Sequence, residues 1–149
     1  MNDIAFRFVD TNSAEYSAER ALRVEVLRKP IGLPAGTEEF PFEGESLHLV
    51  AMHGTEVVGC LLFHPEGVTG RMFQIAVASG LQKTGIGRRL VETMLGCLKS
   101  DGFEEVYGHA RHHAVDFFRR LGFDTYGEPF EEIGIEHRLI RISLKDWRK

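Results

Sequence analysis

The chain has 149 residues and a formal net charge of −4, from 18 Lys and Arg against 22 Asp and Glu. This size fits one domain with a sizeable core, so we predict a single domain over residues 1–149. An acidic balance without a basic tail argues against binding to nucleic acid. No apolar run reaches the length of a membrane span, and the N-terminus lacks the pattern of a secretion signal. We therefore expect a cytoplasmic protein with neither a nucleic-acid nor a membrane partner.

Cysteine and histidine usage gives no sign of a disulfide or a metal site. Cys60 and Cys97 both lie in apolar segments, where buried, reduced thiols are the usual outcome. His109, His112 and His113 form a local cluster. Adjacent histidines cannot share one helical face, and no nearby Cys or carboxylate completes a set of ligands. We predict no metal.

The N-terminal quarter predicts a strand, a helix and a long irregular segment. Apolar residues alternate over 4–9, which indicates a strand. Asn12 followed by Glu15 is typical of a capping box that opens a helix. The helix should end before Pro30, because the residue before proline avoids helical angles. Its apolar stripe is expected at Ala21, Val24 and Leu27.

Residues 31–45 follow without a clear element and are rich in proline and glycine. A loop of this length is unusual inside a compact domain and is often functional. Two interpretations stay open: the segment lines a binding site, or it only covers the sheet.

The rest of the chain alternates strands and helices. Hairpin signals at 53–55 join two strands, and helical periodicity follows the central strand. Strands are expected over 46–52, 56–63, 71–78, 103–110, 123–126 and 138–144, and helices over 86–100 and 114–121. This order predicts a mixed α/β fold with an antiparallel first half and crossover helices in the second half.

The central strand, a glycine-bearing loop and the following helix form the most informative stretch. Gly85 and Gly87 remove side chains from the start of the helix. The unpaired N–H groups of its first turn and the positive end of its dipole are then open to an anion. Lys83, Arg88 and Arg89 add positive charge at the same place. Physical chemistry alone therefore predicts a phosphate site.

The loop sequence narrows the choice of ligand. It contains neither the Gly-Lys-Ser/Thr of a Walker A loop nor the third glycine of the dinucleotide fingerprint. Residues 82–87 read Gln-Lys-Thr-Gly-Ile-Gly and match the pattern Gln/Arg-x-x-Gly-x-Gly/Ala. This resembles motif A of the GNAT superfamily of acyl-CoA-dependent N-acyltransferases. The other interpretation is a tight strand-to-helix turn in which the glycines serve packing.

A second stretch strengthens the resemblance. Residues 117–123 read Phe-Phe-Arg-Arg-Leu-Gly-Phe and look like the end of motif B of the same family. Phe118 stands where many members carry the Tyr that protonates the departing thiolate, which leaves the general acid open. The segment 132–137 is similar to one found in some small GNAT proteins. The resemblance spans residues 4–144.

The resemblance implies a fold and a cofactor site. The fold would be a mixed central sheet of six to seven strands with about four helices and a β-bulge in the motif A strand. Acetyl-CoA would be the co-substrate, with its pyrophosphate in the loop and its pantetheine arm along the strand. The implied binding residues are Ile75, Ala76, Val77, Gln82, Lys83, Thr84, Gly85, Ile86, Gly87 and Arg88.

The implied reaction is direct attack of a primary amine on the thioester in a ternary complex. The backbone N–H groups of Ile75 and Val77 would meet the pantetheine and the acyl oxygen, and Val77 would stabilise the oxyanion. A base must take the amine proton. We consider His137 and Glu132 first, because histidine ordinarily titrates near neutral pH. The alternative for His137 is a structural role. Two further candidates are Gln74, which could hold a water, and His112.

Several points stay open at this level. The acceptor is a small-molecule or a peptide amine, and the donor carries an acetyl or a longer acyl group. The oligomeric state also stays open, with a homodimer as one alternative. The rival function is a regulatory module that binds CoA without catalysis, which the absence of Tyr at position 118 favours.

Overall fold

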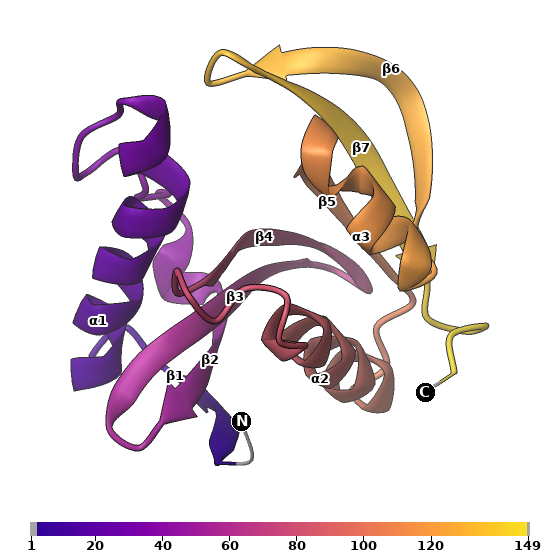
Figure 1. The fold of residues 1–149 in the computed structure, drawn as a ribbon. Coiled ribbons are helices and arrows are strands. Elements are labelled where there is room, and N and C mark those ends of the chain that lie inside the picture. The colour runs from indigo at the N-terminus through magenta and orange to yellow at the C-terminus, as the bar shows by residue number, and fades with distance from the viewer. Residues whose placement is uncertain (1–2, 149) are drawn as a thin grey trace. The chain divides into compact units, whose positions relative to one another are not determined.

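Figure 1 shows the computed structural model, which describes residues 3–148. These residues form two compact units. The first unit runs to His64 and resumes over Gln74–Met94, and the second comprises Pro65–Phe73 and the residues from Leu95 onward. Seven strands follow the order β1-β2-β3-β4-β5-β7-β6, which confirms the mixed α/β class. Three α-helices occur in the described residues, one fewer than expected, because short 3-10 and π turns take the remaining positions.

The first unit contains an antiparallel arrangement of β1 (Ile4–Val9), β2 (Leu47–His53) and β3 (Glu56–Glu66). Gly54, with a φ of 64°, forms the predicted hairpin between β2 and β3. Strand β3 runs three residues beyond its predicted end at 63. The apolar run in these two strands is fully buried, including Leu49, Val50, Cys60, Leu61, Leu62 and Phe63.

Helix α1 (Ala14–Arg23) continues as a π turn over Val24–Arg28. The predicted capping box is wrong, because Ser13 is the N-cap and its side chain makes no capping hydrogen bond. The predicted stripe is wrong at Ala21, which is exposed, and its other two members, Val24 and Leu27, are only half-buried. The buried residues of α1 are Glu19, Leu22 and Arg23. The helix therefore turns a charged pair, rather than alanine, toward the interior.

Helix α2 (Ile86–Ser100) occupies the predicted residues, and its first half packs against β3. A Cβ at Gly59 would lie 3.2 Å from the Leu90 side chain and 3.3 Å from the Ile86 side chain. Such a distance is tighter than a side chain tolerates without movement. Gly59 therefore lets the helix approach the strand closely.

Strand β4 (Thr69–Val77) contains a backbone irregularity in the predicted motif A strand. Gln74 has a φ of 55°, in the left-handed region that residues other than glycine seldom adopt. A left-handed residue is the conformation found at the first position of a G1 bulge. Gln74 therefore marks a backbone irregularity in the strand where the resemblance implies a bulge.

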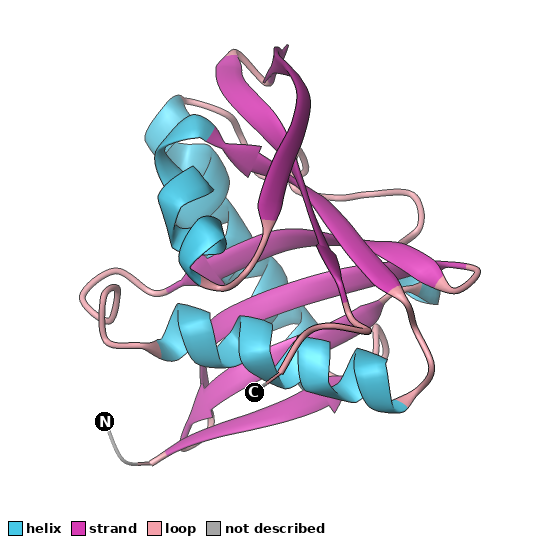
Figure 2. Ribbon diagram, turned by 90° about the vertical axis from the view of Figure 1, so that its right-hand side faces the viewer, coloured by secondary structure: helices cyan, strands magenta, loops and turns pink. Residues whose placement is uncertain are grey.

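In the second unit, β4 pairs in parallel with β5 (Glu105–Arg111), from Thr69 opposite Glu105 to Met72 opposite Gly108. Helix α3 (Val115–Arg120) follows, and β6 (Asp124–Glu132) and β7 (Ile135–Ser143) form a long antiparallel hairpin (Figures 1 and 2). Both strands extend beyond the predicted 123–126 and 138–144 toward the connecting turn. Gly127 and Pro129, in the middle of β6, conceal that extension in the sequence, and a register shift between Tyr126 and Phe130 accommodates them.

In the part of the chain that the structure describes, no helix combines the length and apolar character needed to span a bilayer.

Candidate functional site

The loop between β4 and α2 is shaped by its own polar side chains. Gln82 donates from Nε2 to the carbonyl oxygen of Val77, at 3.1 Å, and the Thr84 hydroxyl donates to the carbonyl of Leu81. Two of the predicted cofactor-binding side chains thus hold the loop closed. Their contribution to a ligand would come from the backbone they arrange.

The glycine at the end of this loop begins α2. Gly85 has a φ of 94°, and its carbonyl accepts the first helical hydrogen bond, from the Arg89 N–H at 3.0 Å. A side chain at such a φ is strained, which explains glycine at this position. The N–H groups of Ile86, Gly87 and Arg88 belong to the first turn and have no partner within the helix. Gly87 leaves them uncovered, as an anion site requires.

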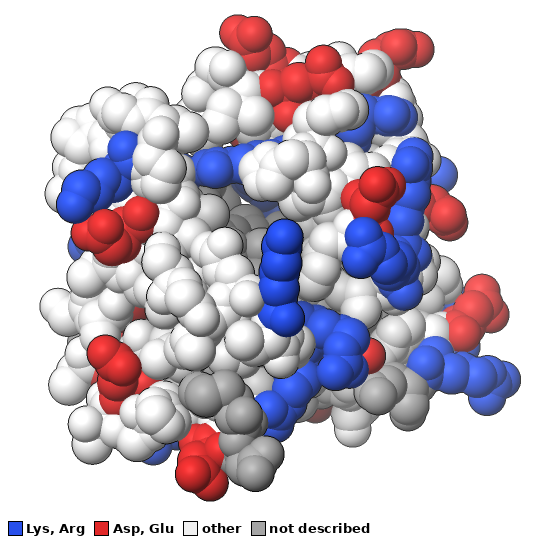
Figure 3. All heavy atoms as spheres, viewed as in Figure 1, with Lys and Arg blue, Asp and Glu red and all other residues white. Residues whose placement is uncertain are grey.

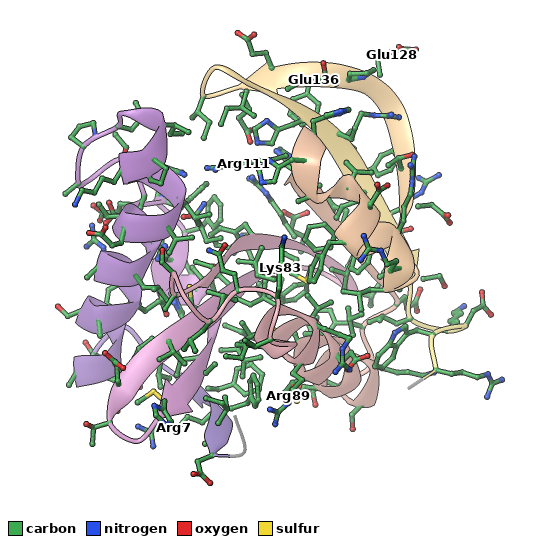
Figure 4. The ribbon with its side chains drawn as sticks, in the orientation of Figure 1. Arg7, Lys83, Arg89, Arg111, Glu128 and Glu136 are labelled. Atoms are coloured by element: carbon green, nitrogen blue, oxygen red, sulfur yellow. The ribbon has the colours of Figure 1, made fainter. Side chains whose placement is uncertain are left out.

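The three basic residues near this helix start differ in what they contact. Arg88 pairs with Glu92 at 2.9 Å, and the Arg89 guanidinium lies over the Phe6 ring at 4.6 Å from its centroid. Lys83 is exposed, has a φ of 65° and forms no ion pair within residues 3–148. Figure 4 labels Lys83 on the loop and Arg89 on α2, and Figure 3 shows basic side chains at this place from the same side. Lys83 is therefore the cation best placed to meet a ligand.

The remaining predicted cofactor-binding residues differ in how much of each side chain is exposed. Ile86 is 2% exposed and Ala76 is 3% exposed, so both side chains belong to the core and only their main chain could meet a ligand. Ile75 and Val77 are half-buried on β4. All ten predicted residues lie in the first unit, on β4, on the loop and at the start of α2.

A buried ion network lies beside this strand in the same unit. Arg23 of α1 is fully buried and uses all five of its N–H donors. Its Nη1 donates to Glu19 at 3.0 Å and to Glu43 at 2.9 Å, and its Nη2 donates to Glu43 at 2.6 Å. The fourth bond goes to the carbonyl of Glu38, and the fifth runs from Nε to Oε1 of Gln74 at 3.3 Å. Arg23 thus links helix α1, the long loop and strand β4.

His48 carries the second positive charge of this network. Its Nδ1 lies 3.0 Å from the Glu19 carboxylate, and its Nε2 lies 2.9 Å from the carbonyl oxygen of Glu43. Both partners only accept hydrogen bonds, so both ring nitrogens must donate and the ring is an imidazolium. Burial opposes this charge, but the hydrogen bond to Glu19 outweighs it and raises the pKa of His48. Two cations then balance the two carboxylates.

Glu19, Glu43 and His48 also lie close enough together to resemble a set of metal ligands. The hydrogen bonds argue against that use. His48 has no lone pair to offer while both its nitrogens donate, and Arg23 already contacts both carboxylates. The guanidinium supplies the positive charge that a metal ion would bring.

The network attaches the long loop to α1. Glu43 also accepts a hydrogen bond from the Tyr16 hydroxyl at 2.7 Å, and Glu38 pairs with Arg20 at 2.6 Å. Burial together with this contact to Glu43 raises the pKa of Tyr16 to about 12. Burial alone would raise the pKa of Glu43, but the hydrogen bonds from Arg23 and Tyr16 lower it. The predicted loop over 31–45 therefore has a defined conformation, held by two carboxylates.

Glu132 and His137, the first two base candidates, lie together in the second unit. Glu132, at the end of β6, is 3.1 Å from Nδ1 of His109 and 3.7 Å from Nε2 of His137. The β6–β7 hairpin brings Glu132 to His109, a pairing that the local sequence around the histidine cluster does not reveal. Predicted His112 pairs separately with Glu136, at 3.1 Å.

The two histidines beside Glu132 differ in access. The side chain of His137 is 4% exposed, and its Nδ1 donates to the Ile135 carbonyl at 2.8 Å. The side chain of His109 is 22% exposed. Burial and the charge of Arg71 lower the pKa of His109, which favours its neutral form. His109 is therefore the more accessible of the two histidines, and the sequence interpretation had assigned it no catalytic role.

Phe118 lies in the core of the second unit, 5% exposed. Its ring meets those of Phe117 and Phe123 edge to face, with centroids 5.0 and 5.5 Å away. It packs as a core residue.

Comparison with known proteins places the chain among acetyltransferases. The family profile described as acetyltransferase (GNAT) domain matches residues 12–144. YjcF of Bacillus subtilis (strain 168), named as an uncharacterized N-acetyltransferase, is 26% identical over 117 residues, covering 78% of this chain and 84% of that protein.

Two solved structures share the fold. An acyl-CoA N-acyltransferase from Pseudomonas aeruginosa superposes with a TM-score of 0.81 at 21% identity, over 93% of this chain and 98% of that one. An aminoglycoside 6′-N-acetyltransferase complexed with coenzyme A gives 0.77 at 16% identity, over 94% and 97%.

Proposed function

The chain belongs to the GNAT acetyltransferase family, and from this we propose that it transfers an acetyl group from acetyl-CoA to a primary amine. The observation that carries the proposal is the start of α2. There the left-handed Gly85, the bare Gly87 and the exposed Lys83 present N–H groups and a positive charge to an anion. The pyrophosphate of coenzyme A has the charge and size for such a site. The coenzyme A complex of a structural neighbour supports this choice.

The proposed reaction is direct attack within a ternary complex. The amine nitrogen forms a bond to the thioester carbon, the C–S bond breaks, and the thiolate of coenzyme A leaves. A main-chain N–H of β4, at Val77, would stabilise the oxyanion, an effect worth about 3 kcal/mol. Cys60 offers no acyl-enzyme route, because it is fully buried and burial raises the pKa of its thiol.

The amine must lose a proton before or during attack. We assign this role to Glu132 and the histidines beside it, with His109 ahead of His137 because more of its side chain is exposed. Phe118 offers no hydroxyl, so the thiolate leaves without an acid at this position.

A second candidate function is a CoA-binding module without catalysis. The core position of Phe118 favours it, since the residue that many relatives use as an acid is absent here. The two candidates share the ligand and differ only in turnover.

Free-thiol release from acetyl-CoA, measured with a panel of small amines and amine-bearing peptides, separates the candidates. The enzyme predicts thiol release that depends on one class of amine and an acetylated product identified by mass spectrometry. Binding of coenzyme A without any amine-dependent release would support the non-catalytic module. Absence of binding would refute both.

A further inference from the structure

The side chain of Gln74 has a fixed orientation that leaves its amide donors available. Arg23 has no acceptor atom, so the end of the Gln74 amide that meets Arg23 Nε, at 3.3 Å, must be the oxygen Oε1. The Nε2 group then points away from the ion network. Within residues 3–148, Nε2 donates to no other group, and the residue is half-buried. An oriented N–H donor without a protein partner is a feature that a ligand can use.

The backbone conformation of Gln74 also indicates a functional position. Its φ of 55° is a conformation for which glycine or asparagine is better suited. Non-glycine residues held in sparsely populated conformations cluster at functional sites, where the surrounding structure maintains them. Here a glutamine is retained at a strained position, and its side chain is fixed by a fully buried arginine. The amide oxygen satisfies Arg23 Nε, whereas no contact within residues 3–148 accounts for the N–H donors of the same amide.

The position of Gln74 indicates which group of the ligand its amide would contact. It immediately precedes Ile75 on β4, the segment that would bind the pantetheine arm and the acyl group. A neutral N–H donor suits a carbonyl oxygen and repels an ammonium group. Since Arg23 and His48 balance Glu19 and Glu43, the network beside it adds no net charge that would attract an ion instead.

We propose that Gln74 Nε2 donates a hydrogen bond to the acyl carbonyl oxygen of bound acyl-CoA, with Arg23 as the positioning residue that orients the amide. This rests on the proposed function and adds a side-chain donor to the main-chain donors of β4. The same hydrogen bond would stabilise the negative charge that the carbonyl oxygen gains during attack.

The test compares acetyl-CoA with coenzyme A, which has the same pantetheine and phosphates and no acyl carbonyl. Isothermal titration gives Kd for both ligands with wild type, Gln74→Glu and Gln74→Met. Gln74→Glu keeps an acceptor for Arg23 and loses the donor, and Gln74→Met loses the donor without adding charge. The melting temperature of each variant checks its fold.

We expect both variants to weaken acetyl-CoA binding by about three- to tenfold, the range for one hydrogen bond, and to leave coenzyme A binding within twofold. Equal weakening of both ligands would indicate a structural role and overturn the proposal. Loss in Gln74→Glu alone would indicate charge repulsion and overturn it as well. Failure of wild type to bind either ligand would refute the proposed function, a result distinct from unchanged variants of a protein that binds both.

Discussion

Gly87 offers a substitution that should strengthen the fold and abolish ligand binding. It is the second residue of α2, and its φ is not in the left-handed region, so its backbone conformation is one that other residues adopt. Replacing glycine by alanine within a helix stabilises by about 0.5–1 kcal/mol. An aspartate in the first turn adds about 0.3–1 kcal/mol through the helix dipole. For a chain of this size, about 1 kcal/mol raises Tm by about 2–4 °C.

The same aspartate would face the phosphates. Two like charges about 4 Å apart repel by about 4 kcal/mol at the dielectric typical of a protein surface. After allowance for salt screening, we expect Gly87→Asp to weaken coenzyme A binding by at least about 100-fold, or about 2.7 kcal/mol. Gly87→Ala should weaken it less, because its methyl group only covers the N–H groups.

Thermal melting with and without coenzyme A measures both effects. Wild type at about 100 times Kd should gain about 2.7 kcal/mol, which corresponds to about 5–10 °C. Gly87→Asp should melt higher than wild type without ligand and show no shift with it. Gly96→Ala, in the middle of the same helix with open space around its Cβ position, is the control: it should gain stability and keep the full shift. A normal ligand shift in Gly87→Asp would refute the assignment of the site.

Three further predictions test other parts of the structure. The hydrogen bond to Glu19 raises the pKa of His48 in the folded state. The stability that this contact contributes is therefore complete below about pH 6.5 and is lost as pH rises through the raised pKa. The unfolding free energy of wild type should fall over that pH range, and His48→Gln should remove this pH dependence. Ile133→Asn should raise Tm by about 1–4 °C. Ile133 and Gly134 have φ values of 50° and 75°, and a turn with this geometry favours Asn-Gly. A lower Tm for this variant would contradict the prediction. Phe118→Tyr should cost about 1–3 kcal/mol in denaturant unfolding without changing turnover, since its hydroxyl would be buried; a faster reaction at unchanged stability would assign it the role of an acid.

The sequence predicts those parts of the fold that depend on local patterns. Strand β1, the hairpin at Gly54 and helix α2 follow from alternation, turn residues and helical period, and all appear as predicted. The glycines of the anion loop are also local signals, because their conformational freedom is needed where they stand. For the same reason the loop residues could be named in advance.

The buried network could not be predicted in this way. Glu19 and Arg23 are four residues apart on α1 and read as a solvent-exposed pair, yet both are fully buried because Glu43 and His48 complete their charges from distant segments. The long-range pairing of Glu132 with His109 has the same origin, since a hairpin brings them together. One local signal exists that the sequence analysis did not use: Glu19, Leu22 and Arg23 are spaced so that they share one face of α1.

Direct transfer of the acetyl group is tested most directly by mass spectrometry of the intact protein and of the amine. The protein is incubated with acetyl-CoA alone, and then with acetyl-CoA and the amine selected from the panel. The account predicts an unmodified protein in the first sample, and in the second an acetylated amine formed together with one free thiol for each product molecule. An acetylated protein that passes its acetyl group to the amine after acetyl-CoA is removed would contradict it.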